Sequence, residues 1–368
     1  MSKQPSKSSS KASAKSGAKT SKPSSARAMG HRLKVSPVAD ILASPPPEFP
    51  AVGTVTLDGL VVPAITPKEP TEDEVLEDYV HRVRLASPRR ERDANEPLAL
   101  GDDVTLDVVA FEGEKLVPFT FRRFWNTVVE PSPQWPGLFE ALVGLPVGES
   151  CTVKVTLPKD SAAKAFAGKT VAVTAVVHNA QEVTLPEGGA EAGFALLGLG
   201  TTFDETLIAM VRDLAQERVD EAEGEWANAV LTSFAKRWKG DIPAKLVDAE
   251  LEKGWARTEG TMMGEAGLPV DVQQQALAQW KADAETRTTT EARLRLELAL
   301  RALGEKEPPS LTKETVLAKL VPIAEDMGFT PEQMEQALTA NKKLAEQFAW
   351  TAFRMMLVQR VLEAATKT

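Results

Sequence analysis

Three stretches decide the fold of the middle of this chain: GDDVTLDVVAFEGEKL (101–116), QWPGLFEALVGLPVGESCTVKVTLP (134–158) and AGKTVAVTAVVHNAQEV (167–183). In the first, Val104, Leu106 and Val108 alternate with polar residues, and the same period of two recurs in the others. Such alternation is typical of strands with one buried face. Residues 136–143 are the one helical patch between them. The sequence therefore predicts an α+β unit over 98–184, an antiparallel sheet wrapped on a short helix.

After residue 201 the apolar spacing changes to the period of 3.6 residues that is typical of helices. The first helix is predicted to run through Leu207 and Phe234, and Gly240 to break it. The next is expected to start at 241–243, because Pro243 suits a first turn. We therefore expect residues 185–368 to be all-α, with further helices at about 271–304, 311–327, 331–338 and 341–365.

Residues 1–50 form a basic low-complexity segment. Its first 35 residues hold nine Lys or Arg, from Lys3 to Lys34, and no acid. The formal charge of the whole chain is −9, so the remainder carries −18. This composition predicts disorder, because burial cannot offset the ordering entropy. Two hypotheses remain for it: a solvated tail, or an arm that contacts phosphates, without the aromatic residues that base stacking needs.

Residues 51–97 are predicted to be a connector. The run 52–62 alternates weakly and could form a strand. Thr71 and the acids after it predict a helix start, and the following apolar residues give that helix one apolar face. Residues 88–92, Pro-Arg-Arg-Glu-Arg, are expected to end the helix in a charged loop.

Several kinds of protein are excluded by composition. Cys151 is the only cysteine, so the sequence allows no intrachain disulfide or Cys-based zinc site, and its strand pattern predicts a core role. The three histidines lack ligand spacing and no phosphate loop occurs, so we expect no metal and no cofactor. No apolar run approaches the roughly 18 residues of a membrane span. With no secretory signal, the chain is expected to be cytoplasmic.

The order of the three stretches resembles an FKBP-type prolyl isomerase domain, with the short helix WPGLFEALVGL followed by a Gly148-Glu149 turn into the next strand. Such a domain uses an apolar, aromatic-walled pocket rather than a nucleophile or metal. Desolvation and shape then lower the barrier of about 20 kcal/mol to rotation of a prolyl bond. The pocket residues implied by this resemblance are Trp135, Leu138, Leu142, Leu116, Phe121, Trp125 and Val173.

The chain departs from the family pattern at several of these positions. The residue after Gly137 is usually a large aromatic, and here it is Leu138. Leu116 and Val173 also stand where aromatics are usual, and Ser161 stands where a Tyr is typical. Either the isomerase is weak or absent, or the remaining aromatic residues rebuild the pocket. Ordinary core packing would account for the same side chains in both cases.

The helical region resembles trigger factor, a family of ribosome-associated chaperones. The resemblance is carried by GDIPAKLVDAEL (240–251) and by GFTPEQMEQALTANKKLAEQFAWTAFRMMLVQRVLEAA (328–365). In that family the helices form a cradle for unfolded chains, which adaptable Met and large Trp side chains would suit. Gly260 and Gly264 suggest a loop between them. The implied client-binding residues are Met262, Met263, Trp255 and Trp280.

The family's ribosome-docking loop, Gly-Phe-Arg-x-Gly-Lys-x-Pro, does not occur in the sequence, and the resemblance covers about 55–368. The partners expected are unfolded or nascent polypeptides and no membrane, with ribosome contact through Lys3 to Lys34 and a homodimer left open. Three hypotheses remain for the function: an ATP-independent chaperone with reduced isomerase activity, a prolyl isomerase whose helices recruit substrate, and a non-catalytic adaptor for one partner.

Overall fold

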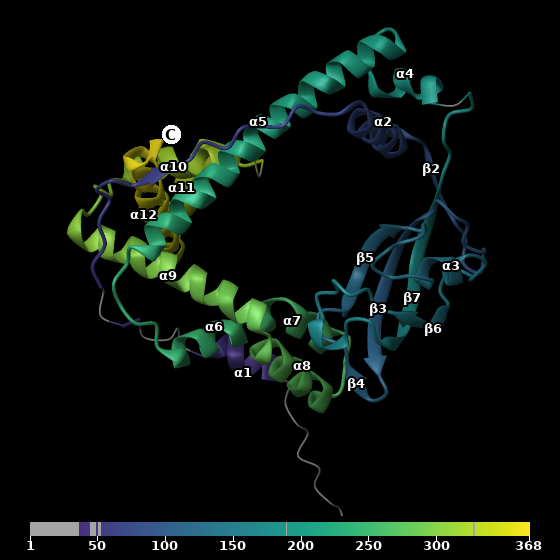
Figure 1. Cartoon of the computed structure of the whole chain (residues 1–368), viewed down its shortest axis with the longest axis horizontal. Helices are drawn as coiled ribbons and strands as arrows, with labels where there is room; N and C mark the ends of the chain where they lie inside the picture. The colour runs from purple at the N-terminus through teal and green to yellow at the C-terminus, as the bar shows by residue number, and fades with distance from the viewer. Residues whose placement is uncertain (1–36, 45–48, 51–52, 189, 327) are drawn as a thin grey trace, which may run out of the picture. The chain divides into compact units, whose positions relative to one another are not determined.

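The computed structural model describes residues 37–44, 49–50, 53–188, 190–326 and 328–368 (Figure 1). Residues 1–36 of the predicted disordered segment 1–50 lie outside these ranges, so what was predicted for Lys3 to Lys34 stays a prediction. For Pro37–Ala43 the prediction of disorder was wrong, because these residues form a helix whose Val38 and Ile41 pack against a buried apolar cluster. Every described residue belongs to one structural unit. Among these residues we find no helix with the length and apolar content needed to cross a membrane.

The predicted antiparallel sheet is confirmed, with strand order β2-β7-β3-β4, β5 also paired to β3, and β6 also paired to β7. All of its pairs are antiparallel. A separate parallel pair joins β1 to β8. The strands are β1 (Val61–Val62), β2 (Arg89–Glu91), β3 (Asp103–Glu112), β4 (Lys115–Leu116), β5 (Arg122–Val128), β6 (Ser150–Thr156), β7 (Thr170–Val183) and β8 (Thr366–Lys367).

The prediction of a charged loop at 88–92 was wrong, because β2 lies within it and pairs with the end of β7. β2 contains no apolar residue, so hydrophobic periodicity could not reveal it. Backbone pairing with β7 forms it instead, and ion pairs accompany that pairing: Arg90 lies 2.6 Å from the Glu182 carboxylate on β7 and 2.7 Å from that of Glu96. The sheet therefore begins before residue 98.

The helical region predicted after residue 185 is confirmed, and the connector carries a helix of its own, α2. Two turns of 3-10 helix, η1 (Lys164–Phe166) and η2 (Ala190–Gly193), complete the elements. The helices are α1 (Pro37–Ala43), α2 (Glu72–Ala86), α3 (Leu138–Leu142), α4 (Phe194–Leu197), α5 (Phe203–Lys236), α6 (Ala244–Arg257), α7 (Glu259–Glu265), α8 (Val270–Ala282), α9 (Ala284–Lys306), α10 (Lys313–Asp326), α11 (Pro331–Ala340) and α12 (Lys342–Ala364).

Two predictions about these helices were wrong. The single helix expected at 271–304 is divided at Asp283, whose carboxylate accepts a hydrogen bond of 2.8 Å from the backbone N–H of Thr286 and so starts a new helix. The loop expected around Gly260 is helix α7. A β-carbon at Gly260 would lie 2.9 Å from the Trp255 ring, so this glycine serves close packing rather than a loop.

The helix start predicted at Thr71 is confirmed. Its hydroxyl accepts a hydrogen bond of 3.3 Å from the backbone N–H of Glu74. In return, the Glu74 carboxylate accepts one of 2.8 Å from the backbone N–H of Thr71. This reciprocal pair is a capping box, which satisfies two N–H groups that a helix start leaves without partners.

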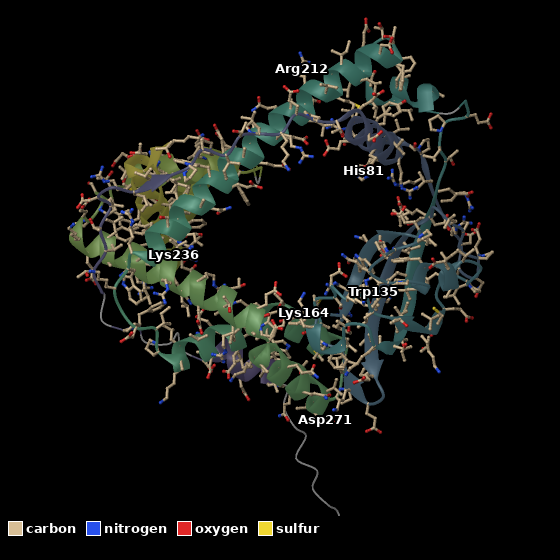
Figure 2. The ribbon with its side chains drawn as sticks, in the orientation of Figure 1. His81, Trp135, Lys164, Arg212, Lys236 and Asp271 are labelled. Atoms are coloured by element: carbon tan, nitrogen blue, oxygen red, sulfur yellow. The ribbon has the colours of Figure 1, made fainter. Side chains whose placement is uncertain are left out.

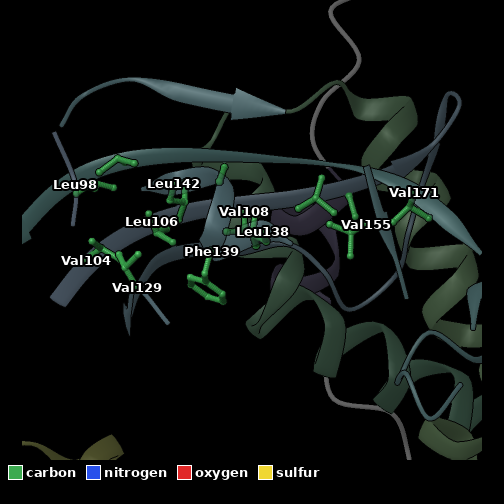
Figure 3. Packing of buried hydrophobic residues seen from close by; sticks show 14 of the residues in the cluster. Leu98, Val104, Leu106, Val108, Val129, Leu138, Phe139, Leu142, Val155 and Val171 are labelled. Atoms are coloured by element: carbon green, nitrogen blue, oxygen red, sulfur yellow. The ribbon is translucent and has the colours of Figure 1, made fainter. Parts of the chain in front are cut away.

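One face of the sheet packs on α3 and forms the main core of the sheet part of the chain (Figure 3). The alternation in β3 is confirmed, since Val104, Leu106 and Val108 are buried there. Leu138 and Leu142 of α3 are fully buried against them. The apolar face of this antiparallel sheet is thus buried in the core, as expected for a sheet with one apolar face.

The opposite side of the sheet, near β4, packs against helices from the C-terminal half. Leu116 and Phe121 belong to one buried cluster with Trp255 of α6 and Met263 of α7. We call these four residues the docking cluster. An ion pair of 2.8 Å between Arg123 on β5 and Glu265 on α7 lies beside it.

The connector is part of the helical core rather than a free linker. Leu60 and Val62 are buried with Phe234 of α5 and Val361 of α12. The strand considered for 52–62 is reduced to β1, at the end of that run. Further along, α2 packs on α5, where Tyr79 meets Phe203 edge-on with ring centroids 5.2 Å apart.

A core substitution tests whether Leu138 holds the sheet together. Leu138→Ala should destabilise the protein by about 2–5 kcal/mol, because it removes a fully buried side chain and leaves a cavity. Urea unfolding of the full chain measures this. Val143→Ala is the matched control, since Val143 is 46% exposed. An equal loss in both variants would contradict this account of the core.

Candidate functional site

The residues predicted to line an isomerase pocket do not gather in one pocket. Leu138, Leu142 and Val173 are fully buried in the sheet core. Leu116 and Phe121 are buried on the other side, in the docking cluster. In this structure the five side chains therefore serve packing, and none of them lines the cleft described below.

The two tryptophans of the predicted pocket are placed differently from these five buried residues. Trp125 is half-buried and meets Phe139 edge-on, with ring centroids 5.8 Å apart. Trp135 is also half-buried, and one side of it faces a cleft. Figure 2 labels Trp135 on the sheet part of the chain and Lys164 on η1. Of the seven predicted pocket residues, only Trp135 lines this cleft.

The cleft has a volume of about 750 Å³ and lies between the loop before β5 and helices α6, α8 and α9. This volume falls within the roughly 300–1,000 Å³ of typical ligand sites. Its apolar lining comes from both the sheet and the helices: Pro118, Phe119, Trp135, Leu157, Pro158 and Trp280.

Phe119 was missed by the sequence analysis. Its backbone lies in the left-handed region, with φ of 64°, where residues other than glycine are uncommon. Its ring centroid lies 5.2 Å from that of Trp280 on α8. The preceding Pro118 signals a turn, but no periodicity there could show which way the ring points.

The other wall of the cleft is polar and belongs to α9. Thr286, Thr289, Thr290 and Arg293 all line it, spaced so that they share one face of the helix. The guanidinium of Arg293 lies 3.2 Å from the carboxylate of Glu250 on α6. The cleft thus joins an aromatic wall to a row of hydroxyls.

The predicted client-binding residues fall into two groups. Trp255 and Met263 are fully buried in the docking cluster, so neither presents a surface to a client here. Met262 and Trp280 are half-buried, and Trp280 lines the cleft. The sequence could not separate them, since the same residue types suit a helix-helix seam and an exposed contact.

A buried carboxyl group lies between α7 and the loop before β5. Burial raises the pKa of Glu259 to about 7, against the lowering effects of the Phe119 and Phe121 backbone N–H groups and of the Arg122 charge. Within the described residues, neither oxygen of this carboxyl makes a hydrogen bond of ordinary geometry. Glu259 is therefore more easily buried when it carries a proton.

No metal chemistry is indicated in the described part of the chain, where we find no group of three His, Cys, Asp or Glu side chains placed to hold an ion. Cys151 is half-buried, and this burial raises the pKa of its thiol. A raised thiol pKa disfavours the reactive thiolate. The residues that line the cleft offer a bound molecule apolar surface and hydrogen-bonding groups.

Comparison with known proteins finds similar sequences for the helical region. Residues 205–363 match the family model described as the C-terminus of the bacterial trigger factor protein. This part of the chain is therefore similar to the C-terminal region of trigger factors. Trigger factors of Bacillus cereus (strain Q1), Bacillus thuringiensis (strain Al Hakam) and Bacillus anthracis (strain A0248) are each 28% identical to it over 243 residues. That alignment covers 66% of this chain and 56% of each relative, so the chain spans little more than half of their length.

A solved structure from work on promiscuous substrate recognition by the trigger factor chaperone is also similar. The similarity covers 85% of this chain and 72% of the solved chain, with 16% identity and a TM-score of 0.31. At this score the similarity to trigger factors is carried by the sequence matches alone.

Glu259 should make stability depend on pH. Its folded pKa of about 7 exceeds the ordinary 4.5, so between these values the folded state keeps a proton that the unfolded chain releases. Stability should therefore fall as the pH rises from about 4.5 to 7, by up to about 3 kcal/mol, and change no further from this group above that range. Glu259→Gln should remove the fall.

The measurement is urea unfolding of the wild type and Glu259→Gln at pH 5 and pH 8. We expect the free energy of unfolding of Glu259→Gln to exceed that of the wild type by little at pH 5 and by much more at pH 8. Glu149→Gln, at an exposed position, is the matched control and should show no such difference. The same advantage at both pH values would overturn the burial account of Glu259.

Proposed function

We propose that this chain is an ATP-independent folding chaperone of the trigger factor type, which binds unfolded or nascent polypeptides and has a weak prolyl isomerase activity. The observation that carries the proposal is the match of residues 205–363 to the trigger factor C-terminus. The 28% identity to trigger factors over 66% of the chain supports it.

The described surface is compatible with polypeptide binding. A chaperone needs apolar contact area and adaptable hydrogen bonding rather than a nucleophile, and the cleft offers aromatic rings beside threonine hydroxyls. The family match favours this hypothesis over an adaptor for one partner.

The isomerase activity is proposed to be weak because of where the pocket residues lie. Leu138, at the position of the usual aromatic floor, is fully buried, and Leu116 and Phe121 are occupied in the docking cluster. The aromatic surface left for a prolyl ring is that of Trp135, Phe119 and Trp280. The FKBP-like sheet keeps efficient prolyl isomerisation as the second candidate function.

We also propose a cytoplasmic location and ribosome contact through the basic segment from Lys3 to Lys34. Nine cations in 35 residues can neutralise phosphates of ribosomal RNA. Deleting residues 2–35 should reduce co-sedimentation with ribosomes, most clearly at low salt. Unchanged co-sedimentation would refute this contact. Whether the chain forms a homodimer can be read from its sedimentation velocity.

The function itself is tested by refolding a protein that aggregates and whose slow refolding step is prolyl isomerisation. An excess of this chain should suppress aggregation, because bound segments are shielded from one another. Catalytic amounts should change the slow phase little. Serum albumin at equal mass is the control. Strong acceleration of the slow phase without suppression of aggregation would favour the isomerase hypothesis. If the chain neither suppresses aggregation nor accelerates the slow phase, the chaperone proposal is refuted.

A further inference from the structure

We propose that the cleft lined by Phe119, Trp135, Trp280 and the α9 threonines is a composite polypeptide site. It takes one extended, uncharged client segment, held by the sheet and the helices at once, with an apolar side chain against the aromatic wall. The inference rests on the proposed function and names where, and by which chemistry, a client is held.

The aromatic wall is assembled from segments far apart in the sequence. Phe119 and Trp135 come from the sheet part, and Trp280 comes from α8. The Phe119 and Trp280 rings are close, with centroids 5.2 Å apart and planes inclined at 51°. An apolar side chain in the cleft would contact rings from both parts, so its binding would depend on both.

Backbone strain supports a binding role for Phe119. A non-glycine residue in the left-handed region is strained, and such residues cluster at ligand-binding sites. Phe119 has φ of 64° and its ring lines the cleft. Glycine at this position would be relaxed, which makes it a useful variant because it removes the ring without adding strain.

The polar wall fits an extended backbone. The Thr286, Thr289 and Thr290 side chains follow one face of α9 along the cleft. Each hydroxyl can both donate and accept, and so can meet the alternating N–H and C=O groups of a client backbone whatever its sequence. A row of hydroxyls therefore suits recognition of the main chain rather than of one particular side chain.

The charges of the cleft favour an uncharged segment. Its lining holds four acids and three bases: Asp160, Glu250, Asp283, Glu285, Arg122, Lys164 and Arg293. Two of the acids are engaged, since Glu250 lies 3.2 Å from Arg293 and Asp283 accepts from the Thr286 backbone at 2.8 Å. Little net charge is left to attract an ion, and the acidic body disfavours a polyanion such as RNA.

Photo-crosslinking tests the site on the wild-type full chain. The probe is a fluorescent peptide of Gly, Ser and Asn with one central benzoylphenylalanine, and mass spectrometry locates its crosslinks. We expect crosslinks to both the 118–122 segment and the 280–293 segment. Crosslinks confined to one of these segments, or to other helices, would overturn the composite site even if the chain suppresses aggregation. A chain that neither binds the peptide nor suppresses aggregation would refute the proposed function itself.

Affinity variants give an independent readout. By fluorescence anisotropy, Phe119→Gly and Trp280→Leu should each weaken binding of the peptide about tenfold. The double variant should lose less affinity than the product of the two single losses, because both rings contact one side chain of the peptide. Trp350→Leu, at a 44% exposed position on α12, should leave affinity unchanged. Adding Asp or Lys on either side of the benzoylphenylalanine should weaken binding. Equal affinity of Phe119→Gly and wild type would overturn the proposal.

Discussion

The apolar contact between the sheet and helices α6 and α7 is the interaction on which the functional geometry depends. Leu116 and Phe121 project from the sheet part into a cluster with Trp255 and Met263. Each fully buried large apolar side chain of this kind contributes roughly 1.5–3 kcal/mol. The contact fixes the loop before β5 against the helices, and the contact between Phe119 and Trp280 in the wall of the cleft follows from it.

This docking changes what an FKBP-like sheet can do. In the arrangement implied by resemblance to that family, Leu116 and Phe121 would help wall a prolyl pocket, whereas here they are used for internal packing. The open aromatic surface is instead shared between Trp135, Phe119 and a tryptophan of α8. A site built in this way suits the holding of a polypeptide better than the tight enclosure of one prolyl ring, which is why we propose a chaperone with weak isomerase activity.

The sequence predicted the structure well where buried apolar residues recur at the regular spacing of a strand or a helix. Val104 to Val108 predicted β3, and the Thr71 capping signal predicted the start of α2. Sequence-based prediction failed where polar pairing or close packing, rather than a repeating apolar pattern, determines the local structure. β2 forms by backbone pairing accompanied by ion pairs and has no apolar residue, and Gly260 looked like a loop although it makes room for the Trp255 ring. The docking cluster joins residues more than 130 positions apart, so no local pattern could show that Phe119 would meet Trp280.

If the docking cluster joins the sheet to helices α6 and α7, loosening it from the sheet side should be felt in these helices. Hydrogen exchange of the amides in α7 (Glu259–Glu265), compared between wild type and Leu116→Ala, tests it most directly, with α12 as internal reference. Exchange should become faster in α7 although the substitution lies on β4, and should not change in α12. Faster exchange confined to β3 and β4, with α7 unchanged, would contradict this role of the docking cluster.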